Sequence, residues 1–186
     1  MGRVNNFVDR AEIIKVFHNL SQSVEGMALA VYLAEIAIQL APEPPESAEL
    51  LRVLLNCLYM IGEQKRPIRQ IKAIYEMRTM TLAGYMPGLL ACEDCGKYDG
   101  GAFYLDEREG MLYCAACAEK HRKQPNLDEG ALYAVRHICL SEMPKLFAFL
   151  LSDKSLSHLT SVSERYLLAH LEQRPKSLDF LNTVLE

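Results

Sequence analysis

Two Cys-x-x-Cys pairs, Cys92/Cys95 and Cys114/Cys117, constrain the fold of this chain more than any other feature. Eighteen residues separate the pairs, a spacing typical of zinc sites with four thiolate ligands. Each pair can close a tight turn, and two such turns brought together present four sulfurs at tetrahedral angles. We therefore predict one zinc ion held by Cys92, Cys95, Cys114 and Cys117, with two disulfides or four reduced thiols as the alternatives.

The segment between the pairs has the pattern of a β-hairpin. Short apolar and aromatic runs at residues 102–105 and 111–113 flank a polar turn at residues 106–110. Gly96, directly after Cys95, can adopt the positive φ that commonly completes such a turn. We expect an inserted zinc-ribbon-like hairpin module at residues 89–118. Four thiolates leave no open position for water, so the zinc is expected to be structural.

The N-terminal sequence bears on the alternatives to zinc. Met1-Gly-Arg-Val-Asn-Asn lacks the apolar core of a secretory signal, which favours a cytoplasmic location and disfavours disulfides. No βαβ pattern surrounds either pair, so a thiol-disulfide enzyme is poorly supported. His121, four positions after Cys117, could replace one sulfur ligand. Cys57 and Cys139 lie in apolar stretches, and we expect both in the core.

Outside this module the apolar residues follow helical spacing. Residues 24–40 are apolar nearly all round, which predicts a central, buried helix in which Glu35 needs a partner. Capping boxes at Asn126/Glu129 and Ser161/Glu164 predict the starts of two later helices. Further helices are expected at residues 1–20, 47–61, 67–84 and 177–185. The predicted fold is mainly α: a bundle of six to eight helices formed by residues 1–88 and 119–186.

Composition and motifs exclude several classes of function. The net charge of −4 gives no overall field that attracts nucleic acid, and no apolar run reaches the ~18 residues that span a membrane. We find no Gly-rich phosphate loop, no Gly-x-Ser-x-Gly and no His-Glu-x-x-His. The five histidines are scattered, none at metal or triad spacing. The sequence therefore predicts a protein that binds partners and is not an enzyme.

Three segments of the chain form a recognisable set. They are Val31-Tyr-Leu-Ala-Glu-Ile36, Tyr75-Glu-Met-Arg-Thr-Met-Thr-Leu-Ala-Gly-Tyr-Met-Pro87 running directly into Cys92-Glu-Asp-Cys-Gly96, and Lys176-Ser-Leu-Asp-Phe-Leu181. The order of helix, Gly-Tyr-x-Pro and cysteine turn is the most specific part. Together they resemble the helical, zinc-containing C-terminal part of the RecO family of bacterial recombinational repair proteins, over about residues 10–182.

The resemblance implies a recombination mediator. Members of this family act with RecR to place RecA on single strands coated by single-stranded-DNA-binding protein, whose acidic, phenylalanine-ended tail the helical domain recognises. They also carry an N-terminal OB-fold barrel that contributes much of their DNA binding. Nothing before the first helix here matches that barrel, so we expect either a piece cut at the domain boundary or a short relative. In both cases single-stranded DNA should bind only weakly.

An acidic tail that ends in an aromatic residue needs an apolar pocket rimmed by basic side chains. The predicted third helix carries both kinds of residue, and the candidate pocket is assigned to Arg69, Ile71, Lys72, Ile74, Tyr75 and Arg78. A solvated helix face is the alternative interpretation of the basic residues. A zinc-ribbon scaffold or transcription-type adaptor without a repair role is the alternative function, which the cysteine spacing alone also permits.

Overall fold

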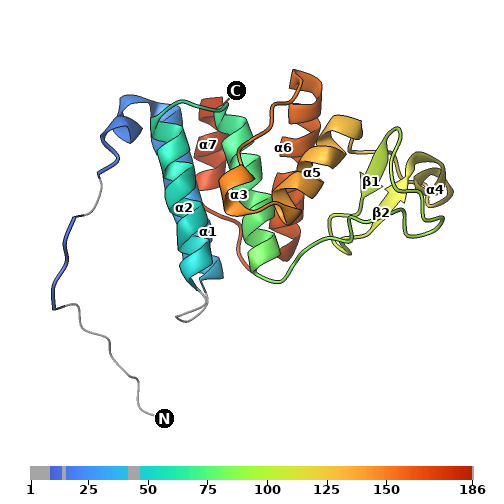
Figure 1. Cartoon of the computed structure of the whole chain (residues 1–186), viewed down its shortest axis with the longest axis horizontal. Helices are drawn as coiled ribbons and strands as arrows, with labels where there is room; N and C mark the ends of the chain where they lie inside the picture. Colours follow the sequence, from blue (N-terminus) through green and yellow to red (C-terminus); the bar gives the residue numbers. More distant parts are fainter. Residues whose placement is uncertain (1–8, 14–15, 42–46, 186) are drawn as a thin grey trace, which may run out of the picture.

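The computed structural model describes residues 9–13, 16–41 and 47–185, and it shows a helical bundle with a small β-hairpin at one end (Figure 1). The predicted fold class is confirmed. Along the chain the elements are η1 (His18–Gln22), α1 (Val24–Leu40), α2 (Ser47–Gly62), α3 (Ile68–Leu82), β1 (Phe103–Leu105), β2 (Leu112–Cys114), α4 (Ala115–Lys120), α5 (Glu129–Leu140), η2 (Met143–Lys145), α6 (Asp153–His170) and α7 (Ser177–Leu185).

Helix α3 is the centre of the bundle, in contact with α1, α2, α5 and α6. Its residues from Gln70 to Met77 are all buried, polar ones included. The prediction that residues 24–40 form the central, buried helix is wrong, because α3 occupies that place. Helix α1 packs against α2, α3 and α7 but leaves Val31 55% and Ile38 80% exposed. The prediction chose the most apolar helix as the central one. The central helix is instead α3, whose polar side chains have hydrogen-bond partners inside the bundle.

Those partners form a buried polar network around Glu76, which is 0% exposed. The Glu76 carboxylate accepts hydrogen bonds from the hydroxyls of Tyr32 and Ser163, each over 2.6 Å. The ammonium of Lys72 lies 2.7 Å from Glu76 and 2.7 Å from Glu164. The network therefore joins α1, α3 and α6 through the middle of the bundle.

Two predicted helix starts are wrong. Helix α5 is capped by the side chain of Asp128, which accepts from the backbone N–H of Ala131, and not by Asn126. Helix α6 begins at Asp153 with Ser152 as its cap, eight residues before Ser161. The capping-box pattern considers only neighbours in sequence. In the structure the side chain of Asn126 instead hydrogen-bonds to the backbone of Leu105 in the hairpin.

The first part of the chain also differs from prediction. Residues 1–8 and 14–15 of the predicted 1–20 helix lie outside the described residues. The described residues 9–13 and 16–17 are not helical, and the single helical turn is η1. Among the described residues, no helix combines the length and apolarity that crossing a membrane requires.

Glu35 has the partner that the sequence analysis expected. It accepts hydrogen bonds from the backbone N–H groups of Lys176 and Ser177, over 2.8 and 3.0 Å, and from the Ser177 hydroxyl over 2.6 Å. These groups stand at the start of α7, where backbone donors lack partners within the helix. A side chain of α1 thus caps the last helix and fixes it against the bundle.

Candidate metal centre and charged surfaces

The two cysteine pairs come together beside the hairpin. Cys92 and Cys95 lie in the loop before β1, Cys114 ends β2, and Cys117 lies in α4. Their four sulfur atoms are all within 4.8 Å of one another, and those of Cys95 and Cys114 are 3.7 Å apart. With metal–sulfur bonds of about 2.3 Å, the edge of a tetrahedral site is about 3.8 Å. The cluster therefore has the size and donor set to hold a metal ion.

Backbone hydrogen bonds shape the first cysteine turn. The N–H of Gly96 donates to the carbonyl of Cys92 over 2.9 Å, and the N–H of Cys92 donates to Lys97 over 2.8 Å. Gly96 has a φ of 71°, the left-handed conformation that glycine adopts readily and that was expected to complete this turn. The N–H of Glu93 donates to Leu112 over 2.8 Å, which fixes this turn to β2.

The predicted hairpin is confirmed. β1 and β2 pair antiparallel, with Phe103 opposite Cys114 and Leu105 opposite Leu112. The inward side chains of these residues are buried, so the short sheet has a core face. This register places Cys114 at the end of the sheet, where the turn into α4 brings Cys117 back toward it.

The cluster favours one thiolate. Burial raises the pKa of Cys92, but hydrogen bonds from the backbone of Cys114, Cys95 and Asp94 outweigh it and lower that pKa to about 6. Burial, with hydrogen bonding to Cys114, raises the pKa of Cys117 to about 12. The backbone of Lys97 lowers the pKa of Cys95, but hydrogen bonds with Cys92 and Cys114 outweigh it, so the net shift is upward. Four thiols this close cannot all ionise without a cation among them.

His121 does not belong to the sulfur cluster. Its Nε2 lies 2.9 Å from the Asp94 carboxylate, and its ring centroid is 5.0 Å from that of Tyr113. Among the described residues the metal-binding group consists of the four cysteines. Cys57 and Cys139 are buried in the core, as expected, where burial raises the pKa of each, that of Cys139 to about 11.

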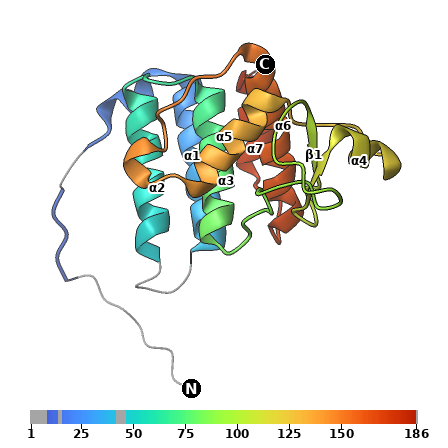
Figure 2. The ribbon, with the colours of Figure 1, turned by 45° about the vertical axis from the view of Figure 1, so that its right-hand side comes forward.

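The hairpin is fixed to the bundle by residues that the sequence analysis did not single out. Arg136 of α5 donates to the carbonyls of Leu89 and Tyr98 and lies over the Tyr98 ring, 4.2 Å from its centroid. On α6, Arg165 pairs with Glu107 of the hairpin turn over 2.9 Å. Figure 2 shows the hairpin and α4 beyond α5 and α6. The role of Arg136 could not be predicted from the sequence, because the carbonyl groups to which it donates lie 38 to 47 residues away.

The candidate docking residues do not form a surface pocket in the described structure. Ile71, Ile74 and Tyr75 are fully buried, and Lys72 is 3% exposed within the Glu76 network. Arg78 donates to the carbonyls of Ile138 and Cys139 at the end of α5. Of the six residues, Arg69 is the one that is exposed, and it contacts the carbonyl of Leu185. The prediction failed because it counted residues on a helix without knowing which face the bundle covers.

An exposed basic surface does exist where α3 begins. We call Lys65, Arg66 and Arg69 the basic end; their side chains reach the surface before and within the first turn of α3. Arg66 donates to the carbonyl of Phe147 over 2.9 Å, in the segment that follows η2. Leu150 in the same segment is 76% exposed. Basic and apolar groups therefore occur together here, contributed by parts of the chain about 80 residues apart.

Comparison with known proteins gives a consistent result. Residues 21–179 match the family described as Recombination protein O C terminal. The DNA repair protein RecO of Acetivibrio thermocellus is 29% identical over 177 residues, which cover 95% of this chain and 70% of that protein. The DNA repair protein RecO of Symbiobacterium thermophilum is 27% identical over 98% of this chain and 74% of its own length.

The match spans the helical bundle and the cysteine module together. Its limits, residues 21 and 179, lie in η1 and in the first turn of α7, so every element between them is included. The family match thus extends the resemblance of the three short segments across the bundle and the hairpin, from η1 to the first turn of α7. This chain belongs to the recombination protein O family, RecO, and corresponds to its C-terminal region.

Proposed function

We propose that this chain is the protein-docking part of a recombination mediator in DNA repair, and that it acts by binding and not by catalysis. In this role it helps to load RecA, together with RecR, onto single strands coated by single-stranded-DNA-binding protein. The observation that carries the proposal is the family match over residues 21–179. The relatives' name, DNA repair protein RecO, supports the repair role.

The four cysteines are proposed to hold a structural zinc ion. Zinc prefers four thiolates in tetrahedral geometry, and the 3.7 Å separation of Cys95 and Cys114 suits that geometry. A bound zinc supplies the positive charge that lets four clustered thiols ionise. With four sulfur ligands no position remains for substrate or water, which agrees with a role in stability.

The acidic tail of single-stranded-DNA-binding protein is proposed to dock at the basic end. Its carboxylates would face Lys65, Arg66 and Arg69, and its phenylalanine would contact the apolar segment that carries Leu150. The N-terminus of α3 adds a partial positive charge to this surface. Aromatic anchors and basic partners together are what a short acidic-aromatic peptide requires.

Calorimetry with an acidic peptide ending in phenylalanine tests this assignment. Charge reversal at Arg69, Arg69→Glu, should weaken binding by roughly 1–2 kcal/mol, because attraction is replaced by repulsion. Deleting the peptide's phenylalanine should cost more, since a buried aromatic usually dominates such an interface. Arg108→Glu in the exposed hairpin turn makes the same charge change outside the basic end and should leave the affinity unchanged.

Two outcomes would contradict the assignment. If Arg69→Glu and Arg108→Glu weaken binding equally, the peptide responds to net charge and the basic end is not its site. If the unaltered chain shows no binding at all, the zinc-bearing scaffold or adaptor without a repair role becomes the better description.

A further inference from the structure

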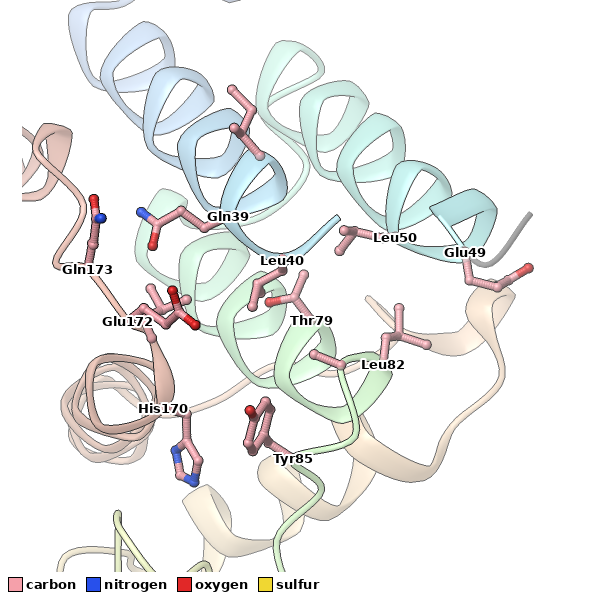
Figure 3. A pocket seen from close by; sticks show the side chains of 13 residues that line it. Gln39, Leu40, Glu49, Leu50, Thr79, Leu82, Tyr85, His170, Glu172 and Gln173 are labelled. Carbon is pink, nitrogen blue, oxygen red and sulfur yellow. The ribbon is translucent and has the colours of Figure 1, made fainter. Parts of the chain in front are cut away.

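A cavity of about 830 Å³ opens at the other end of α3 from the basic end (Figure 3). The ends of four helices meet there. The last turns of α1 and α3 and the residues that end α6 form most of the wall, and the first turn of α2 closes it. Its volume lies within the range of sites that enclose a ligand or a peptide side chain. None of the functions proposed above uses this cavity.

The apolar part of the wall continues out to the surface. Leu40, Leu50 and Leu171 line the cavity from three different helix ends. At its mouth Ile38 is 80% exposed and Tyr85 is 45% exposed. Large apolar side chains that stay exposed beside a cavity extend the area available to a partner beyond the cavity itself.

The electrostatics of the cavity favour a cation. Among the described residues, its lining includes the carboxylates of Glu49 and Glu172, one histidine, His170, and no lysine or arginine. Helices α1, α3 and α6 all end here, and each C-terminus carries a partial negative charge. Neither α1 nor α3 has a basic residue in its last turn to offset that charge, whereas α6 has His170, whose Nδ1 lies 2.8 Å from the carbonyl of Tyr166.

Nearby charges do not reverse this balance. The guanidinium of Arg52 lies 3.1 Å from Glu49, but both side chains are exposed and Arg52 is outside the lining. The side chain of Glu172 makes no hydrogen bond or ion pair with another described residue.

We propose that this cavity binds a peptide segment of a partner protein in which a lysine or arginine stands beside large apolar residues. The cationic group would face Glu172, and Glu49 would add attraction from the opposite side of the cavity (Figure 3), while the apolar neighbours would cover the leucines and the exposed mouth. The exposed apolar rim favours a peptide over a small free cation, which would leave that rim uncovered. An acidic tail would be repelled here, so this site is independent of the one proposed at the basic end.

Methyl NMR of the whole chain can test the proposal. The probe is a blocked hexapeptide, acetyl-Gly-Leu-Lys-Leu-Phe-Gly-amide, compared with its counterpart in which glutamate replaces lysine. The lysine peptide should shift the methyl signals of Leu40, Leu50 and Leu171 in a saturable way. The glutamate peptide should bind at least tenfold more weakly, because it places like charges together.

Variants separate charge recognition from general apolar binding. Glu172→Gln should weaken the lysine peptide about two- to fivefold, and Glu172→Gln with Glu49→Gln about tenfold. Both side chains are exposed, so the melting temperature should stay unchanged. Glu142→Gln, an equivalent change at an exposed glutamate outside the cavity, should leave the affinity as it was.

Three results would overturn the proposal. One is the absence of leucine shifts at millimolar lysine peptide; another is equal binding of the lysine and glutamate peptides. The third is that acetyl-lysine amide alone binds as tightly as the hexapeptide, which would make the cavity a site for a small cation.

Discussion

Glu76 is a fully buried carboxylate at the centre of the bundle, and its neighbours explain why it is tolerated there. A buried charge is very costly unless a partner of opposite charge and several hydrogen bonds compensate it. Lys72, Tyr32 and Ser163 supply these contacts. Burial and the Glu76 carboxylate both raise the pKa of Tyr32, so its hydroxyl stays a donor. Burial lowers the pKa of Lys72, but Glu76 and Glu164 outweigh it, and the amine stays charged.

The first prediction concerns Lys72. Lys72→Ala should lower the free energy of unfolding by about 3–5 kcal/mol, because it leaves Glu76 buried without its counter-ion. Denaturant unfolding followed by circular dichroism measures this value. Lys145→Ala, at an exposed lysine, is the matched control and should change stability by less than about 0.5 kcal/mol. Equal effects of the two substitutions would show that the network contributes little.

Glu35 provides a prediction that depends on pH. The side chain and backbone of Ser177 stabilise its charged form and lower its pKa from the ordinary value of 4.5. A group whose pKa is lower in the folded state contributes stability above its unfolded pKa, and that contribution is lost as pH falls through the folded value. Glu35→Ala should therefore cost about 1–2 kcal/mol near neutral pH, the upper range for a lost helix cap.

The same difference should shrink below about pH 4.5, as the carboxylate of the unaltered chain takes up its proton. Unfolding curves of both proteins between pH 7 and pH 3 measure it. A difference that stays constant over this range would show that packing, and not the charged cap, is what Glu35 contributes.

At the scale of elements, the hairpin has too few residues to be stable by itself. A two-stranded sheet is marginal in water, and these strands have three residues each. Its buried face and its contacts with α5 and α6 stabilise the hairpin in part. The four cysteines flank the hairpin, so a metal ion that they bind would hold the two ends of this segment together. Metal binding is therefore expected to supply most of the free energy that orders residues 92–117.

Removal of the metal tests this expectation. Cys92→Ser, or a strong chelator, should abolish the amide exchange protection of β1 and β2 while α1, α3 and α6 keep theirs. Metal analysis of the unaltered chain should give one zinc per chain. Binding should weaken as pH falls, because protons compete for the thiolates. Absence of zinc, or exchange protection that does not depend on it, would contradict the prediction.

The features that the sequence predicts correctly at this scale are those set by residues close together in the chain. The bounds of α1 and α7 and the hairpin follow from apolar periodicity and turn residues, and the cysteine cluster from spacing within 26 residues. The start of α6 was missed because its cap, Ser152, lacks the capping-box glutamate, whereas Ser161 has one three positions later. The pocket assigned to α3 failed because burial of Lys72 depends on Glu164, which lies 92 residues away.

At the scale of the whole molecule, charge is separated along α3. The basic end stands at its N-terminus, and the acidic cavity stands at its C-terminus. The two surfaces suit partners of opposite charge, and neither presents the continuous basic track along which nucleic acid usually binds. The net charge of −4 adds a weak repulsion toward polyanions.

We therefore predict weak binding of single-stranded DNA by these 186 residues. The remaining affinity should fall steeply with salt, because each phosphate contact releases counterions. Fluorescence anisotropy with a labelled oligonucleotide at several salt concentrations measures both quantities. Submicromolar affinity at physiological salt would show that the helical region carries a DNA site of its own.

The pairing of α1 with α7 has a consequence for how the bundle forms during synthesis. Glu35 and Ser177 are 142 residues apart in the sequence. The face of α1 that packs against α7 therefore lacks its packing partner until α7 has been synthesised. At about 5–20 residues per second a ribosome needs roughly 7–28 seconds for that distance. Throughout that interval the nascent chain exposes an apolar helix face, which makes it a natural client for chaperones.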